Sequence, residues 1–80
     1  MIRLEKKLYK ILSQVLNVPI EQINNESSPD TIDGWDSLKH MNLVLAIEQE
    51  FNIQFTEEQI FEMLNVALIK ESLKEHELEI

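Results

Sequence analysis

The chain has 80 residues, 44% of them hydrophobic, and it contains no cysteine. A chain of this length is expected to form a single domain over residues 1–80 and to bury only about 60% of its unfolded surface. Neither a disulfide nor a thiolate metal site is available, so apolar packing alone must supply the stability. No apolar stretch approaches the roughly 20 residues of a membrane-spanning helix, so we expect no membrane insertion and a cytoplasmic location.

The net charge is −8 and is unevenly distributed along the chain. Residues 1–16 carry +3, and residues 17–80 therefore carry −11. Such an acidic surface repels nucleic acid and anionic membranes and raises the association rate with basic docking patches. The same charge is equally consistent with a surface that only keeps a small domain soluble. Because an acidic surface repels nucleic acid in either case, we expect no nucleic-acid partner.

Residues 2–16 are predicted to form an amphipathic helix with a basic outer face. The residues of its apolar face recur at helical spacing: Leu4, Leu8, Ile11, Leu12 and Val15. The helix is expected to end before Pro19, because a residue that precedes proline avoids the helical conformation.

Residues 17–36 are predicted to form a long irregular segment, because turn and cap formers are frequent there. A loop of this length is uncommon in a small domain and usually has a function. Ser28 and Pro29 have the order expected at the opening of a single helical turn. Three isoleucines are expected to anchor the loop to the core: Ile20, Ile23 and Ile32.

The second predicted helix runs from Ser37 to about Phe51, with Asp36 as its N-cap and Asn52 at its end. Its middle, residues 43–47, is apolar over most of the circumference. A helix of this kind is expected to be buried between other helices.

Two further helices are predicted near the C-terminus. The first, short one runs from Glu57 to about Leu64 and begins with a capping box formed by Thr56 and Gln59. Its apolar contacts are expected to be Ile60, Phe61 and Leu64. The second runs from Val66 to about Glu77, with Asn65 as its cap and with an inner stripe of Val66, Ile69 and Leu73.

No segment shows the alternation typical of a strand. The sequence therefore predicts an all-α fold: a four-helix bundle with three longer helices, one short helix and a long first loop.

The tripeptide Asp36-Ser37-Leu38, at the head of the second helix and after a long loop, resembles the motif of the acyl carrier protein family. Further segments sit where that family has similar residues: Gly34-Trp35, Leu43-Val44, Ala46-Ile47-Glu48-Gln49-Glu50-Phe51 and Ile53-Gln54-Phe55. The resemblance covers nearly the whole chain and implies an acyl-carrier-like bundle.

The resemblance also implies a function. Ser37 would carry 4′-phosphopantetheine as a phosphodiester, which a phosphopantetheinyl transferase installs from coenzyme A with magnesium. Asp36 and Leu38 would flank the attachment site for recognition by the transferase. The thiol of the arm would hold acyl intermediates as thioesters, so the chain would be a monomeric carrier and not an enzyme. Its partners would be acyl-transferring, ligating or synthase enzymes. The acyl chain would lie between helices, lined by Leu43, Val44, Ile47 and Phe61.

The sequence departs from the pattern of fatty-acid carriers directly after the motif. Those proteins commonly have acidic residues where this chain has Lys39, His40 and Asn42. This face is the usual docking surface of the family. In this chain the residues expected to contact partner enzymes there are Lys39, His40, Met41 and Glu48. The departure makes a specialised pathway, such as polyketide, peptide or polysaccharide tailoring, at least as good an expectation as fatty-acid synthesis.

Two alternatives remain beside an acyl carrier. One is a peptidyl or aminoacyl carrier of the same family. The other is an unmodified acidic helical domain that binds a basic partner, and such a domain would tolerate Ser37→Ala.

Two further interpretations fail on the residues. A hydrolase triad of Ser37, His40 and Asp36 lacks the nucleophile elbow, and adjacent residues on a helix do not face each other. A calcium loop around Gly34 would place Pro29 and Thr31 at ligand positions.

The remaining aromatic and imidazole side chains also carry expectations. His40 and His76 are expected to be solvated and not metal ligands. Trp35 could contact the arm or a partner, but an anchor of the loop on the core is favoured.

Overall fold

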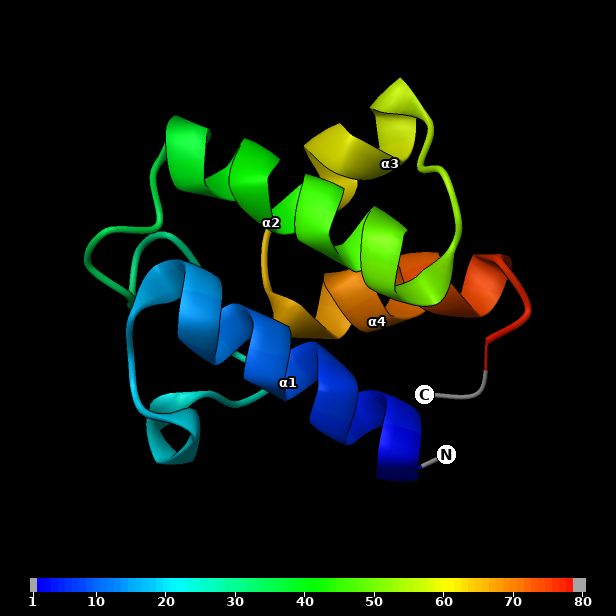
Figure 1. Ribbon diagram of the computed structural model, residues 1–80. Coiled ribbons are helices and arrows are strands. Elements are labelled where there is room, and N and C mark those ends of the chain that lie inside the picture. Colours follow the sequence, from blue (N-terminus) through cyan, green and yellow to red (C-terminus); the bar gives the residue numbers. More distant parts are fainter. Residues whose placement is uncertain (1, 79–80) are drawn as a thin grey trace.

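A computed structural model describes residues 2–78, which fold into helices and connecting turns without a strand (Figure 1). The α-helices are α1 (Ile2–Leu16), α2 (Ser37–Phe51), α3 (Glu57–Glu62) and α4 (Val66–Glu75). A 3₁₀ helix, η1 (Ile20–Gln22), lies in the long first loop. The prediction of an all-α fold with three longer helices and one short one is confirmed.

The helices α1 and α2 pack against each other and run in opposite directions (Figure 1). Most of the predicted apolar face of α1 is buried: Leu8 and Leu12 lie fully inside, and Ile11 is buried, whereas Leu4 and Val15 are partly buried. α2 contributes Leu43, Val44 and Ile47 to the same core. α4 closes the core with its predicted inner stripe of Val66, Ile69 and Leu73.

The predicted caps are confirmed, because each depends only on residues at most four positions apart. Thr56 and Gln59 form the capping box of α3, and Asn65 accepts a hydrogen bond from the Leu68 N–H at the start of α4. Asn52 ends α2 in the left-handed conformation, with φ of 56°. Ser28 opens a single turn, and its hydroxyl accepts a hydrogen bond from the Asp30 N–H.

Two predicted helix ends were wrong by two residues. α3 ends at Glu62 and not at Leu64, because Met63 leaves the helical conformation with ψ of 69°. α4 ends at Glu75 and not at Glu77, because Glu77 adopts a left-handed φ of 65°.

Several apolar residues lie outside the core, contrary to prediction. α2 is not buried all round: Leu45 is 53% exposed, so only one face of the helix enters the core. Phe61 and Leu64 are also exposed, and the buried apolar contact of this segment is Met63. In the first loop Ile23 and Ile32 are buried as expected, whereas Ile20 is exposed on η1.

The long first loop is fastened to the start of α4. The Val66 N–H donates to the carbonyl oxygen of Ser27, and the Ala67 N–H donates to that of Asn25, both over 3.0 Å. First-turn N–H groups of a helix have no intrahelical acceptor, so the loop supplies partners that α4 lacks.

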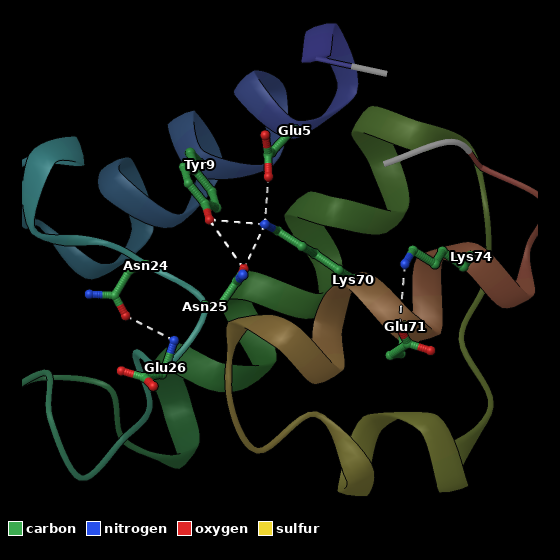
Figure 2. Close-up of polar contacts among 8 residues, drawn as sticks. All are labelled: Glu5, Tyr9, Asn24, Asn25, Glu26, Lys70, Glu71 and Lys74. Carbon is green, nitrogen blue, oxygen red and sulfur yellow. Dashed lines mark hydrogen bonds and ion pairs between the residues drawn. The ribbon is translucent and has the colours of Figure 1, made fainter.

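A cluster around Lys70 joins α1, the loop and α4 (Figure 2). The Lys70 ammonium donates to the Glu5 carboxylate over 2.6 Å, to the Asn25 side-chain oxygen over 2.7 Å and to the Tyr9 hydroxyl over 3.0 Å. The Lys70 side chain is only 12% exposed. Burial by itself lowers the pKa of Lys70, but the hydrogen bonds to Glu5 and Tyr9 outweigh it and raise the pKa above 10.5.

We expect Lys70→Met to lower the free energy of unfolding by about 1–2 kcal/mol, because it removes the charged donor shared by three acceptors. Urea unfolding followed by circular dichroism measures this. Lys74→Met is the matched control, since Lys74 pairs with the exposed Glu71 over 3.4 Å. That pair should contribute no more than about 0.5 kcal/mol, and an equal effect of the two substitutions would contradict the assigned role of Lys70.

The stabilisation by Lys70 should also depend on pH. Because the pKa of Lys70 is raised on folding, its contribution is fully present below the unfolded value of 10.5 and is lost as the pH rises through the folded value. The difference between wild type and Lys70→Met should therefore be constant up to about pH 10.5 and shrink above it.

Candidate functional site

Ser37 is the first residue of α2, and its backbone position follows from the local sequence. Gly34 takes a φ of +89°, a backbone conformation that glycine adopts readily and that residues with a side chain rarely adopt, and the loop turns into the helix there. Asp36 is extended and acts as the N-cap, as predicted: its side chain accepts a hydrogen bond from the Lys39 N–H over 2.9 Å. The side chain of Ser37 is exposed at this helix start.

The start of α2 is suited to an attached anion. The first-turn N–H groups of Ser37 and Leu38 have no acceptor within the helix, and the positive end of the helix dipole lies there. The Asp36 carboxylate accepts its hydrogen bond from the Lys39 N–H. The N–H groups of Ser37 and Leu38 can therefore donate to another acceptor.

Trp35, which directly precedes the motif, is buried with 3% exposure and anchors the loop on the core, as favoured from the sequence. Its indole N–H donates to Nδ1 of His40 over 3.1 Å. The two rings are stacked, with centroids 6.2 Å apart and an angle of 22° between their planes. The residue before Asp36 is thus joined to the first turn of α2.

His40 also contacts α3, because its Nε2 lies 3.1 Å from the carbonyl oxygen of Ile60. Since an indole N–H can only donate, Nδ1 of His40 must accept, and the ring proton therefore sits on Nε2 and is donated to Ile60. The expectation that His40 is solvated was wrong. The sequence held no signal for this bond, because its partner lies 20 residues further along the chain.

His76 was also expected to be solvated, and this expectation was also wrong, because its ring contacts Gln59 and Phe55. Nε2 of His76 lies 3.1 Å from Oε1 of Gln59, and the His76 ring meets the edge of Phe55 at 5.5 Å. The Gln59 amide in turn donates to Glu75 over 2.6 Å. These contacts tie the end of α4 to the start of α3.

A groove of about 490 Å³ opens beside Ser37, between α2 and α3. Ser37, Asp36 and His40 lie along it, and most of the other side chains that line it are apolar: Trp35, Met41, Ile60, Phe61, Met63 and Leu64. The two exposed apolar residues that the sequence assigned to the core here, Phe61 on α3 and Leu64 just after it, therefore border this groove. An arm attached to Ser37 would begin at its edge.

The structure separates the residues predicted to surround an acyl chain. Leu43 and Val44 are 1% exposed and Ile47 is 0% exposed, and all three belong to the packed core. None of them borders the groove beside Ser37. Phe61 does border it, but its side chain is 76% exposed. Whether this set holds a cargo stays a prediction.

The residues predicted to dock partners occupy different environments. Leu38 and Met41 are exposed on α2, Met41 beside the groove, and Lys39 is half-buried. Glu48 lies near the other end of α2, where its carboxylate accepts a hydrogen bond from the Phe55 N–H over 2.9 Å. Glu48 thereby holds the connector between α2 and α3, and a docking role for it stays a prediction.

The arrangement does not equip Ser37 for catalysis. One ring nitrogen of His40 bonds to Trp35 and the other to Ile60, and the Asp36 carboxylate caps α2. Neither His40 nor Asp36 is therefore directed to the Ser37 hydroxyl as a base.

Residues 2–78 hold no group of three or more His, Cys, Asp or Glu side chains that could bind a metal ion. Within the same residues, no helix combines the length and the apolar character needed to cross a membrane.

The exposed side chain of Ser37 therefore lies at a helix start beside an apolar groove. The comparisons with known proteins identify the family of the chain. Residues 6–73 match the family described as "Phosphopantetheine attachment site". The chain is 46% identical over 55 residues to the acyl carrier protein of Buchnera aphidicola subsp. Schizaphis graminum (strain Sg), a match that covers 68% of each chain.

A second relative matches over more of the chain. The acyl carrier protein of Buchnera aphidicola subsp. Baizongia pistaciae (strain Bp) is 36% identical over 73 residues, which cover 91% of this chain and 94% of the relative. The chain therefore belongs to the acyl carrier protein family, and the predicted resemblance is confirmed. The predicted cofactor, 4′-phosphopantetheine, is that of the matched family.

We expect Asp36→Ala to lower the free energy of unfolding by about 1 kcal/mol, because the Lys39 N–H loses its cap. Asp36→Asn keeps an acceptor at the same position and should stay within a few tenths of a kcal/mol of wild type. Urea unfolding followed by circular dichroism compares the two variants. An equal loss in both would show that the charge of Asp36, and not its cap, stabilises α2.

Proposed function

We propose that Ser37 carries the 4′-phosphopantetheine arm and that the chain holds acyl intermediates as thioesters and presents them to partner enzymes. The observation that carries the proposal is the placement of the Ser37 hydroxyl, which is exposed at the N-terminus of a helix whose other face is buried. The site has a fixed origin, an environment suited to phosphate and an apolar groove beside it.

Attachment requires little chemistry from this chain. The Ser37 oxygen forms the bond to phosphorus, and the adenosine 3′,5′-bisphosphate of coenzyme A leaves. The hydroxyl proton has to pass to a base of the transferase, because His40 and Asp36 are engaged elsewhere. The chain therefore acts as the substrate of the transferase and not as its own catalyst.

The residues around Ser37 suit the phosphodiester that results. The free N–H groups of Ser37 and Leu38 and the helix dipole favour a negative charge at this position. Lys39, in the same first turn, adds a cationic side chain. When bound, the arm supplies the thiol that holds acyl groups, which this chain itself lacks because it has no cysteine.

The partners of the chain follow from this role. A phosphopantetheinyl transferase has to read the residues around Ser37, and acyl-transferring, ligating or synthase enzymes have to reach the end of the arm. The net charge of −8 supports basic docking patches on those enzymes. We further propose a specialised biosynthetic pathway, because Lys39 and His40 stand where fatty-acid carriers commonly have acidic residues.

Incubation with coenzyme A, magnesium and a broad-specificity phosphopantetheinyl transferase should add the mass of one phosphopantetheine to the wild type and nothing to Ser37→Ala. The attachment needs the Ser37 oxygen, so the substitution removes the reaction and leaves the fold intact. Intact-mass spectrometry measures the gain, and circular dichroism checks that both proteins are helical.

The alternative of an unmodified interaction domain predicts a different result. In that case neither protein gains mass, even with a transferase from the same source, although both stay folded. A gain in Ser37→Ala would place the attachment at another residue and contradict the proposed site.

Lys39→Asp should raise the kcat/KM of an acyltransferase of fatty-acid synthesis for the loaded carrier by about fivefold, close to 1 kcal/mol, because it restores an acidic residue on the docking face. Lys6→Asp is the matched control, since it makes the same change of charge on the exposed face of α1. An equal gain in both variants, or none in Lys39→Asp, would show that Lys39 does not select partners.

A further inference from the structure

We propose that His40 is a gate residue that keeps cargo out of the core and confines it to the groove beside Ser37, so that this carrier suits short acyl groups. This inference rests on the proposed function for its cargo, but the gate itself is a property of the folded chain. It is carried by the two hydrogen bonds of His40, by the packing behind them and by the way α3 is held.

The two hydrogen bonds of His40 join three segments beside the attachment site. Nδ1 accepts from the Trp35 indole at the end of the first loop, and Nε2 donates to the Ile60 carbonyl oxygen on α3, each over 3.1 Å. His40 itself lies on α2, one turn after Ser37. The imidazole therefore links α2 to α3 where both border the groove.

Behind His40 the space between the helices is filled. Leu43, Val44, Ile47 and Met63 are between 0% and 1% exposed and belong to one apolar cluster. A long acyl chain can enter this region only if α3 moves away from α2. That movement separates Nε2 of His40 from the Ile60 carbonyl and leaves a partly buried donor and acceptor without partners.

α3 depends on such tethers because it has only six residues, too few for a helix that is stable alone. Its first turn is held by the Thr56 capping box and by the contacts of Gln59 with Glu75 and His76. Its second turn is held by His40 through Ile60. Loss of the His40 bond should therefore free the end of α3 beside Ser37, while the start of α3 remains attached.

The closed gate determines how much of an acyl chain can be shielded from water. A short acyl group on an arm from Ser37 can lie in the groove, which is open to solvent and bordered by exposed side chains such as Met41 and Phe61. With the gate closed, each further methylene group of a long chain stays in contact with water. The carrier then gives long acyl groups no more protection than short ones.

The test loads the wild type and three variants with butyryl, octanoyl and palmitoyl arms from the corresponding acyl-coenzyme A esters. The cleavage rate of each thioester by hydroxylamine is followed by intact mass. His40→Ala removes both hydrogen bonds, whereas His40→Gln keeps one acceptor and one donor. His76→Ala is the matched control, because it removes a histidine contact to α3 at the end away from Ser37.

In the wild type, His40→Gln and His76→Ala, the rates for the three chain lengths should agree within about twofold. In His40→Ala the palmitoyl thioester should be cleaved about tenfold more slowly than the butyryl thioester, because the opened core covers it. Protection of palmitoyl in the wild type as strong as in His40→Ala would overturn the proposal, and so would equal rates for all lengths in His40→Ala.

A second measurement uses the unloaded protein, so that the gate and the proposed function can fail separately. Nile red should bind to His40→Ala with a clearly larger rise in fluorescence than to the wild type or His76→Ala, because the opened core adds apolar surface to that of the groove. Trp35, the single tryptophan, reports the loss of its contact with His40. If Ser37 accepts no arm, the proposed function fails, whereas the dye still decides on the gate.

Equal dye binding in all proteins, or none in His40→Ala, contradicts the gate. If circular dichroism shows that His40→Ala does not fold, His40→Leu replaces it in both measurements, because leucine fills more of the space and makes neither hydrogen bond.

Discussion

The structure depends above all on the burial of one face of α2 against α1 and α4. Leu43, Val44 and Ile47 leave water almost completely, and this fixes the helix in position and in rotation about its axis. The opposite face must then be exposed, which explains why Leu38, Met41 and Leu45 lie at the surface. Ser37 stands at the exposed start of this fixed helix, so an attached arm begins at a defined point.

The contacts that hold the first loop against α1 and α4 are a second structural constraint. Lys70 joins α1, the loop and α4 (Figure 2). In addition, the N–H groups of Val66 and Ala67 at the start of α4 donate to loop carbonyl oxygens. These contacts hold the part of the loop around Asn25 and Ser27. The end of the loop is held separately, by the burial of Trp35 and its hydrogen bond to His40.

Most of the features that the sequence predicted correctly depend on neighbouring residues. The N-cap of α2, the capping box of α3, the cap of α4 and the left-handed end of α2 each involve groups at most four residues apart. The apolar stripe of α1 follows from helical spacing alone. The predictions failed where burial depends on what packs alongside. Four apolar residues are left uncovered by the other segments of residues 2–78: Leu45, Phe61, Leu64 and Ile20. Met63 took the buried place near α3 because the helix ends at Glu62 and turns the chain inward there.

The sequence by itself determined the helices, the family and the position of Ser37 at the start of α2, because caps, periodicity and a short motif are local properties. Only the tertiary structure decided what surrounds that serine. The contact of His40 with Ile60 spans 20 residues and that of Lys70 with Glu5 spans 65. A local pattern cannot specify such pairs, since each forms only when the packing of the core brings the two segments together. The groove beside Ser37 is bordered by side chains from the loop, α2 and the α3 region, and it exists only in the folded chain.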